Sequence, residues 1–297
     1  MPHHPPLHPI TQVVIKMLTG LKVKRSFCSA DHTQRYLRYH AKRSTRPLEL
    51  PKLRSEVAVE ELDGATVVRL NPDHKVPQGT VVFLPGGAYV RPPLQEHWRF
   101  ADGLVQRSDW QIIVPIYPKA PRATVTDALA MLHQLMNEIH GPWILMGDSA
   151  GGGLALALTE ELIHLKKRLP KHLILISPWL DIALRDPKSK ELEPQDPILA
   201  CEGLREIGRQ WAGGLSTDDP RVSPLLGITP ECPPMTLFTG TREIFTPDIL
   251  TLHHKASSLG VDSTLIVGEG LFHCYPIFAI PEAQNALESI LQRLLDS

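Results

Sequence analysis

The chain has 297 residues, 42% of them apolar, which is enough for one large domain or for two smaller ones. Its 31 Lys and Arg residues nearly cancel its 32 Asp and Glu residues, so the whole-chain charge gives no reason to expect a nucleic acid or an anionic membrane as partner. The four cysteines lack the spacing of a metal or redox site, so we expect no bound metal. So small a number of cysteines in a chain of this length favours a reducing, cytoplasmic location.

The first 50 residues are rich in Arg, Lys and His and do not begin like a signal peptide. The stretch 10–21 is too short and too polar to span a bilayer. Apolar residues in it fall near helical spacing: Val13, Val14, Met17, Leu18 and Leu21. We expect an amphipathic helix whose apolar side packs against the mouth of the protein's own active site, and an N-terminal cap segment over residues 1–56.

A domain of residues 57–297 is expected to open with a β-hairpin, because Val57–Leu62 and Ala65–Leu70 are joined by Asp63-Gly64. Short apolar runs typical of buried parallel strands follow: Thr80–Leu84, Gln111–Ile116, Trp143–Met146, Leu173–Ile176, Met235–Thr239 and Ser263–Val267. Helical stretches lie between or after them: Glu96–Arg107, Thr124–His140, Gly151–Leu169, Pro247–Leu259 and Pro281–Leu294. This alternation predicts an α/β fold, with a mostly parallel sheet covered by helices on both faces. The gap at about 181–234 is too long for a simple connection and predicts a cap insertion.

The strongest chemical signal follows the strand Trp143–Met146, which runs into Gly147-Asp148-Ser149-Ala150-Gly151 and then into a helical stretch. This strand–turn–helix context is the one that a nucleophile elbow requires, with Ser149 exposed at a tight turn. The alternative is an ordinary glycine-rich turn between a strand and a helix. A second signal is the buried strand that ends in Pro85-Gly86-Gly87-Ala88, where backbone N–H groups can approach a ligand oxygen.

Two residues after later strands complete the predicted catalytic triad. His273 follows the last strand, and Glu243 follows the strand before it, so the order Ser149, Glu243, His273 is the order that this type of elbow uses. Asp248 is the other candidate acid, but it comes directly after Pro247 at the expected start of a helix, where an acid meets the helix dipole favourably. We therefore predict Glu243 as the acid and a structural role for Asp248.

Together these motifs resemble the hormone-sensitive-lipase-like branch of the α/β-hydrolases, of the bacterial acetyl-esterase type, over roughly residues 57–297. The resemblance rests on five segments: Pro85-Gly86-Gly87-Ala88, Tyr117–Pro121, Gly147–Gly152, Ser177–Asp181 and Phe272-His273. The family usually has His-Gly-Gly-Gly at the first of these, so Pro85 lacks the side chain that orients the loop, whereas Ala88 keeps its N–H. The acid is Glu243 where the family more often has Asp.

The resemblance implies the α/β-hydrolase fold with a helical cap, no cofactor, and a small-molecule ester substrate. It implies a carboxylesterase-type serine hydrolase that cleaves short-chain esters through an acyl-enzyme, with an oxyanion hole formed by Gly86, Gly87, Ala88 and Ala150. Relatives of this type often pair through the last strand, which implies a homodimer through Ser263–Val267. The alternatives are an amidase of the arylformamidase type and a ligand-binding relative that has lost catalysis.

Overall fold

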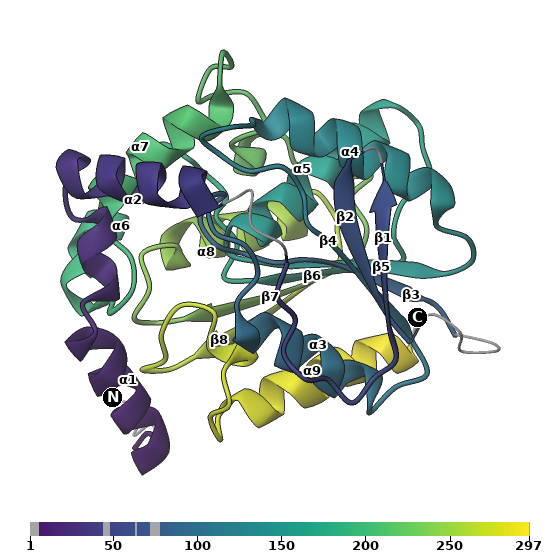
Figure 1. Cartoon of the computed structure of the whole chain (residues 1–297), viewed down its shortest axis with the longest axis horizontal. Coiled ribbons are helices and arrows are strands. Elements are labelled where there is room, and N and C mark those ends of the chain that lie inside the picture. Colours follow the sequence, from purple (N-terminus) through teal and green to yellow (C-terminus); the bar gives the residue numbers. More distant parts are fainter. Residues whose placement is uncertain (1–5, 44–47, 63, 72–77, 297) are drawn as a thin grey trace.

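The computed structural model describes residues 6–43, 48–62, 64–71 and 78–296, and within them eight strands form one sheet (Figure 1). The strands, in chain order, are β1 (Val57–Leu62), β2 (Ala65–Leu70), β3 (Thr80–Leu84), β4 (Gln111–Pro115), β5 (Trp143–Asp148), β6 (Leu173–Ile176), β7 (Met235–Gly240) and β8 (Ser263–Gly268). Their spatial order is β1-β2-β4-β3-β5-β6-β7-β8. Strands β3 to β8 run parallel, and the hairpin β1–β2 pairs antiparallel at one edge. The predicted α/β class, the hairpin and every predicted strand are confirmed.

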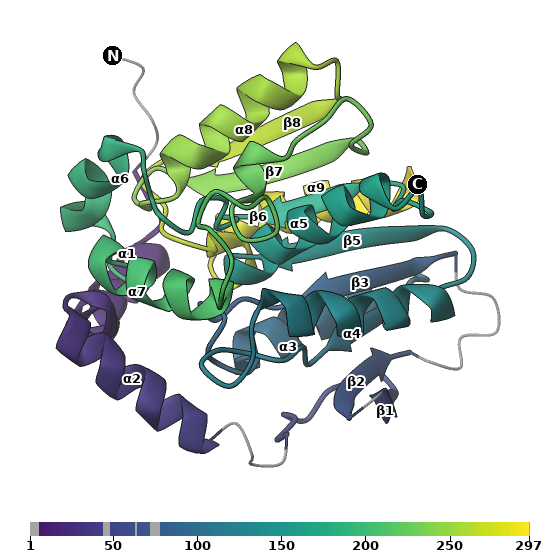
Figure 2. The ribbon, with the colours of Figure 1, turned by 90° about the horizontal axis from the view of Figure 1, so that it is seen from above.

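Helices cover both faces of the sheet, as the alternation predicted (Figures 1 and 2). One face carries α3 (Gln95–Val105) and α9 (Ala283–Leu295), and the other carries α4 (Val125–Glu138), α5 (Ala150–His164) and α8 (Thr246–Ser258). The central strands β3, β5, β6 and β7 are buried along their whole length. This double cover explains why those strands read in the sequence as continuous apolar runs rather than as alternating patterns.

The remaining helices gather over the carboxyl ends of the parallel strands (Figure 2). They are α1 (Pro9–Gly20), α2 (Ala30–Arg43), α6 (Pro187–Leu192) and α7 (Cys201–Ala212), with the short 3-10 turn η1 (Val23–Phe27). The N-terminal segment and the insertion touch each other there. A Cβ added at Gly203 of α7 would lie 2.5 Å from Cα of Phe27, and Gln34 Nε2 donates to Glu206 Oε1 at 2.9 Å. The two segments that the sequence predicted as separate parts of a cap therefore form one layer.

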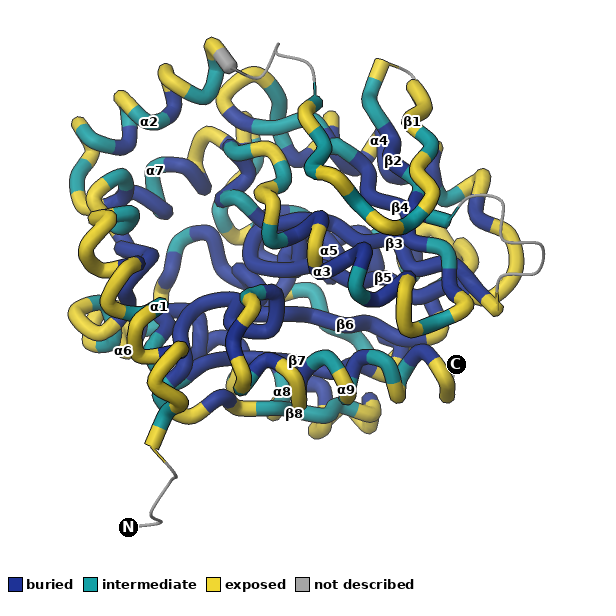
Figure 3. Tube along the Cα trace, turned by 60° about the horizontal axis from the view of Figure 1, so that its bottom comes forward, coloured by how far each residue is buried: buried dark blue, intermediate teal, exposed yellow. Residues whose placement is uncertain are grey.

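Helix α1 exposes most of the apolar side that the sequence analysis expected to be buried. Of its five apolar residues named above, only Leu18 is buried, whereas Val13, Met17 and Leu21 are more than half exposed. The buried side of the helix is instead formed by Thr11 and Leu18. Figure 3 shows the same contrast, with exposed stretches along α1 and α2 and buried strands in the middle of the molecule. The expectation that the whole apolar side packs on the active-site mouth is wrong, because the tether at Glu282 turns Thr11 inward.

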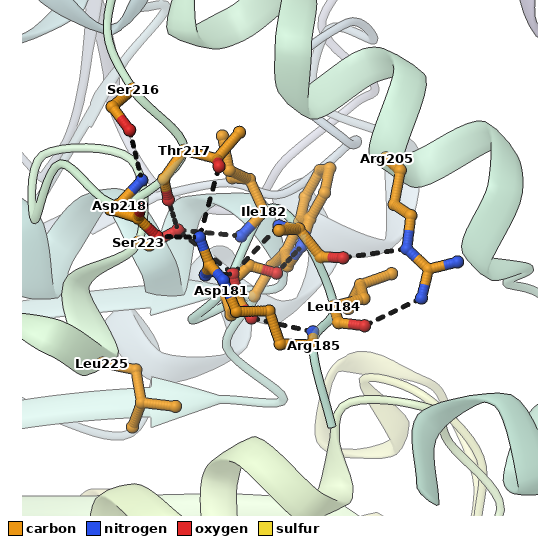
Figure 4. A network of polar contacts seen from close by, with 12 residues as sticks. Asp181, Ile182, Leu184, Arg185, Arg205, Ser216, Thr217, Asp218, Ser223 and Leu225 are labelled. Atoms are coloured by element: carbon orange, nitrogen blue, oxygen red, sulfur yellow. Dashed lines mark hydrogen bonds and ion pairs between the residues drawn. The ribbon is translucent and has the colours of Figure 1, made fainter. Parts of the chain in front are cut away.

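A polar network ties the two ends of the insertion together (Figure 4). The buried carboxylate of Asp181 accepts the backbone N–H groups of Ala183 and Arg185, both at 2.9 Å, and it pairs with the guanidinium of Arg185. Ser223, at the far end of the insertion, donates to the same carboxylate at 3.2 Å. Arg205 of α7 donates to the carbonyl groups of Ala183 and Leu184, both at 2.8 Å. Both ends of the insertion and its longest helix are thereby held at one point.

Strand β8 lies at the free edge of the sheet, and Val267 on it is 44% exposed. Pairing of two copies through this strand stays a prediction, and a monomeric mass by light scattering at micromolar concentration would refute it. No helix in the described ranges is long and apolar enough to cross a membrane.

Asp181→Ala should lower the free energy of unfolding by about 2–3 kcal/mol, because it leaves buried N–H groups and one side of Arg185 without an acceptor. Asp186 is the matched control in the same segment. It is only half-buried and accepts the Lys188 N–H at the start of α6, so Asp186→Ala should cost only about 1 kcal/mol. Urea denaturation measures both. Equal losses for the two variants would show that the network at Asp181 does not brace the insertion.

Candidate active site

Ser149 stands at the turn between β5 and α5, with its backbone in a left-handed conformation at φ 52° and ψ −122°. The turn exists because two glycines let three segments pass close together. A Cβ at Gly147 would lie 2.3 Å from the carbonyl oxygen of Gly151, and one at Gly151 would lie 1.8 Å from that of Leu84. Any other residue would force β3, β5 and α5 apart. The strained turn holds the Ser149 side chain at the carboxyl edge of the sheet, where only 7% of the residue is exposed.

The side chains of Ser149, His273 and Glu243 form a continuous chain of hydrogen bonds. Nε2 of His273 lies 2.9 Å from Oγ of Ser149, and its Nδ1 lies 2.5 Å from Oε2 of Glu243. His273 is on the loop after β8, and Glu243 is on the loop after β7. The three residues are far apart in sequence, but parallel strands end at the same edge of the sheet, so their loops meet there.

The second oxygen of Glu243 is held by three further donors. Its Oε1 accepts Ser177 Oγ at 2.8 Å, Thr239 Oγ1 at 2.7 Å and the Gly240 N–H at 2.8 Å. Glu243 is completely buried, so these bonds replace the water that its charge would otherwise need. Burial by itself lowers the pKa of His273, but the hydrogen bond and charge of Glu243, followed by the charges of Asp196 and Asp148, outweigh it and raise that pKa above its usual value. The pair therefore favours a positively charged imidazole.

Asp248 has no comparable set of partners. It lies in the first turn of α8, as the sequence indicated, but it is buried, and among the described residues no hydrogen-bond partner is present for its Oδ2. Burial, together with the nearby charges of Asp181 and Asp186, raises the pKa of Asp248 to about 7. Asp248 therefore lies at the helix start that the sequence predicted, in a buried position that disfavours its charged form.

The loop after β3 passes directly beside Ser149. Its Gly87, Ala88 and Tyr89 have positive φ angles of 130°, 54° and 57°. The N–H of Gly86 donates to Oδ1 of Asp148 at 2.9 Å, so it is not available to a ligand oxygen as the sequence analysis expected. Within the described part of the chain, the N–H groups of Gly87, Ala88 and Ala150 have no protein acceptor. These three groups remain as candidate donors.

Two residues that hold this loop were missed in the sequence. Asp148 accepts the Gly86 N–H with one oxygen, and its other oxygen lies 3.2 Å from Nε2 of His97 in α3. Both side chains are buried. Nothing local marks His97, which lies within an ordinary helical stretch. The structure thus supplies, from another helix, a histidine near the loop where the family's usual histidine is replaced by Pro85.

Cys274 follows His273 and occupies a left-handed conformation at φ 58°. Its Sγ lies 3.3 Å from Nε2 of His273 and 3.6 Å from Oδ2 of Asp148. Burial, followed by the charges of Asp148 and Glu243, raises the pKa of the thiol well above its usual value. A thiol that stays protonated is a poor nucleophile, which agrees with the expectation that Cys274 is a packing residue.

An aromatic stack leads from the insertion to His273. The ring of Trp211 in α7 stacks on Tyr89 at 4.2 Å between centroids, and Tyr89 stacks on Trp179 at 5.4 Å. Phe245 continues the stack at 5.8 Å from Trp179 and meets the ring of His273 edge-on at 5.2 Å. The sequence analysis singled out neither Trp211 nor Phe245. Phe272, which directly precedes His273, lies outside this stack and packs on Phe278.

Asp196 is a further residue that was missed. Its carboxylate accepts the N–H groups of Ile198 and Leu199, and its Oδ2 accepts the N–H of Ile244 at 3.0 Å. Ile244 directly follows Glu243, so the insertion braces the loop of Glu243. The sequence held a signal for this role, because Asp196 is followed by Pro197 and an Asp-Pro pair commonly starts a turn in which the Asp side chain accepts backbone N–H groups.

The described residues contain no group of three or more His, Cys, Asp or Glu side chains arranged to hold a metal ion. Of the N-terminal histidines, His3 and His4 lie outside the described residues. His8 begins α1, where its side chain accepts the Ile10 N–H, so it serves as a helix cap.

Comparisons with known proteins agree with this architecture. A sequence model of the family described as the alpha/beta hydrolase fold matches residues 81–277. The chain is 30% identical to a triacylglycerol lipase of Mycobacterium tuberculosis over 76% of this chain, but it spans only 48% of that protein's length. It is 29% identical to an esterase of Acinetobacter venetianus, over 71% of this chain and 73% of that one. A solved esterase from the bacterial hormone-sensitive lipase family superimposes with a TM-score of 0.81 at 24% identity and covers 98% of both chains, which shows the shared fold.

Asp248→Asn should flatten the dependence of stability on pH. The pKa of Asp248 rises from 3.8 in the unfolded chain to about 7 in the folded one, so the folded state binds the extra proton between these values. The unfolding free energy of the wild type therefore falls as pH rises through this window. The variant should lose that slope and gain up to about 4 kcal/mol over the wild type at pH 8. Urea denaturation at pH 5 and pH 8 measures the difference, and parallel curves would contradict it.

Proposed function

The chain belongs to the α/β-hydrolase family, and on that premise we propose that it is a serine hydrolase that cleaves short-chain carboxylic esters through an acyl-enzyme. The observation that carries the proposal is the hydrogen-bond chain from Ser149 through His273 to the buried Glu243, with distances of 2.9 and 2.5 Å. The relatives named above, an esterase and a triacylglycerol lipase, also cleave esters by name. Two independent observations thus support ester cleavage by Ser149: the hydrogen-bond chain at this residue and the similarity of the chain to named esterases and lipases.

In the proposed reaction, Oγ of Ser149 attacks the ester carbonyl carbon while Nε2 of His273 takes its proton. The imidazolium then gives that proton to the departing alkoxide, which leaves as the alcohol, and the acyl group stays on Ser149. Water attacks next, with His273 again taking and returning the proton, and the carboxylic acid is released. Glu243 fixes the ring orientation and stabilises the charged imidazole of both steps.

We assign the oxyanion hole to the N–H groups of Gly87, Ala88 and Ala150. A donor of this kind typically contributes about 3–4 kcal/mol to the transition state. Asp148 and His97 touch no reacting atom in this scheme; they position the loop through the Gly86 N–H. This pair fits the replacement of the family's usual histidine by Pro85, because the loop still has a polar anchor.

We infer that the substrate has a short acyl group, of about two to six carbons, because bulky aromatic rings limit the space beside Ser149. Tyr89 and Trp179 are fully packed in the aromatic stack, which α7 closes with Trp211. The segments 1–56 and 181–234 are proposed to act together as the cap over the site. A cytoplasmic location is also proposed, supported by the four cysteines, all of which are free.

Ser149→Ala should lower kcat for p-nitrophenyl acetate and butyrate about a million-fold while the fold remains intact, because no other nucleophile replaces the hydroxyl. The wild type should be labelled by a fluorophosphonate probe and should hydrolyse these two esters faster than long-chain ones. Circular dichroism checks the fold. Undiminished turnover in the variant would exclude the serine mechanism, and labelled protein that cleaves amides better than esters would favour an amidase.

Glu243→Gln should lower kcat about 10⁴-fold with KM little changed, since the amide cannot stabilise the imidazolium. It should also shift the acid limb of the kcat/KM profile to lower pH, because the charge of Glu243 helps to raise the pKa of His273. Asp248→Asn is the matched control and should leave both the rate and the acid limb unchanged. The reverse pattern would assign the acid to Asp248.

Deletion of residues 1–24 should change KM or the range of accepted esters more than it disturbs the sheet. The deleted part contains α1 and Lys24, whose Nζ donates to the carbonyl of Asp196 in the insertion at 3.0 Å. Its loss should loosen the cap without removing any strand. Steady-state kinetics on the ester panel measure the effect, and unaltered KM values for every ester would rule out a role of this segment in the cap.

A further inference from the structure

Helix α1 presents an apolar stripe to the outside of the molecule. Ile10, Val13, Met17 and Leu21 are 52%, 63%, 54% and 66% exposed. Their spacing of three, four and four residues puts them on one side of the helix and its C-terminal cap. The opposite side already supplies the contacts with the body, through Thr11 and Leu18. The stripe therefore contributes nothing to the core of this chain.

Exposed apolar side chains are clustered in this stripe. Fourteen large apolar side chains are exposed in the described part of the chain, and four of them belong to this one short element. Single exposed apolar side chains are common on any protein, but a contiguous set marks an interaction surface.

The helix cannot bury the stripe by rolling inward, because its start is tethered. The backbone N–H of His8 donates to Oε1 of Glu282 at 2.8 Å, and the hydroxyl of Thr11 donates to Oε2 of the same carboxylate. Leu7 packs beside Gly270, on the loop that leads to His273. The tether fixes the inward side of α1 and so holds the stripe outward, next to the loop of the catalytic histidine.

The segment that carries the stripe is strongly basic. Residues 8–42 contain seven Lys and Arg residues and a single acid, Asp31, although the whole chain has a net charge of −1. Lys16 and Lys22 are exposed at the stripe itself. On the exposed side of α2, Arg35, Arg38 and Lys42 follow one another at helical spacing. Both helices form the same outer edge of the molecule (Figures 1 and 2).

We propose that α1 and α2 dock this protein on the surface of an anionic lipid bilayer, with the stripe of α1 inserted among the acyl chains and the basic side chains at the headgroups. An apolar helix side flanked by Lys and Arg is the pattern of a helix that lies in a membrane interface. Basic clusters add attraction to anionic lipids. A second protein would match the stripe equally well, but the excess of positive charge favours a surface that is uniformly negative.

This docking is peripheral. A helix of 12 residues is about 18 Å long, too short to cross the hydrocarbon core of a bilayer. The net charge of the whole chain is close to zero and gave no reason to expect an anionic membrane. That total hides a local excess of positive charge in the N-terminal helices, which lie at one edge of the molecule. The proposal does not depend on the proposed ester cleavage.

Vesicle flotation tests the docking, with every protein carrying Ser149→Ala so that the lipid esters stay intact. The parent should float with vesicles of phosphatidylcholine and phosphatidylglycerol in equal parts, but not with phosphatidylcholine alone, and raised salt should weaken the binding. Val13→Gln with Met17→Gln should weaken binding about tenfold, as should Arg35→Gln, Arg38→Gln and Lys42→Gln together. Leu165→Gln, which changes a half-exposed leucine after α5, is the matched control and should bind like the parent.

Absence of binding to the anionic vesicles at low salt would overturn the proposal. So would equal binding of the Val13/Met17 variant and the Leu165 control. A dimer by light scattering that the Val13/Met17 variant alone abolishes, without vesicle binding by the parent, would assign the stripe to a second copy of the chain. Thermal unfolding shows whether each variant is folded, and the α2 variant provides an independent test should the α1 variant not fold.

Discussion

Gly147 and Gly151 let β3, β5 and α5 approach one another closely, and the geometry around Ser149 follows from this contact. A side chain at Gly151 would collide with the backbone of Leu84, so the strand and helix reach this distance only without one. The approach forces Ser149 into a left-handed backbone conformation, and that conformation raises its hydroxyl toward His273. The same approach brings the loop after β3 beside Ser149, where its free N–H groups lie. Ser149 and these N–H groups are thus positioned by one packing contact.

The buried carboxylates near the carboxyl edge of the sheet differ in how fully they are hydrogen-bonded. Glu243 and Asp148 are buried, yet the carboxylate oxygens of each are hydrogen-bonded. Two of the donors to Glu243 are Ser177, directly after β6, and Thr239 in β7. Asp248 is buried with one oxygen lacking a partner in the described structure, and its pKa rises to about 7 as a result. Both Glu243 and Asp248 follow β7, so the two differ in how many hydrogen-bond donors the fold supplies to each carboxylate.

The two segments outside the sheet lie together over the carboxyl ends of the strands and both reach the candidate site (Figure 2). The insertion reaches His273 through the aromatic stack and reaches the loop of Glu243 through Asp196, which accepts the N–H of Ile244. The N-terminal segment packs on the insertion and is tethered at Glu282 near the loop of His273. This arrangement leaves α1 with one side bound to the body and the other facing outward, so the same helix can serve the site and an external surface.

The strands, the parallel sheet with its antiparallel hairpin, and the positions of Ser149, Glu243 and His273 on loops at the carboxyl edge could all be predicted from the sequence. These features are local or periodic: continuous apolar runs, the Asp-Gly pair of the hairpin, and Gly-x-Ser-x-Gly between a strand and a helix each specify geometry within a few residues. The packing of distant segments, in contrast, sets which N–H groups are free, brings His97 to Asp148, and places Trp211 on Tyr89. It also sets which side of α1 is buried, because the helix has apolar residues on two sides and its tether, Glu282, lies more than 270 residues away. Contacts across such distances depend on how elements pack, and no periodicity within one element carries that information.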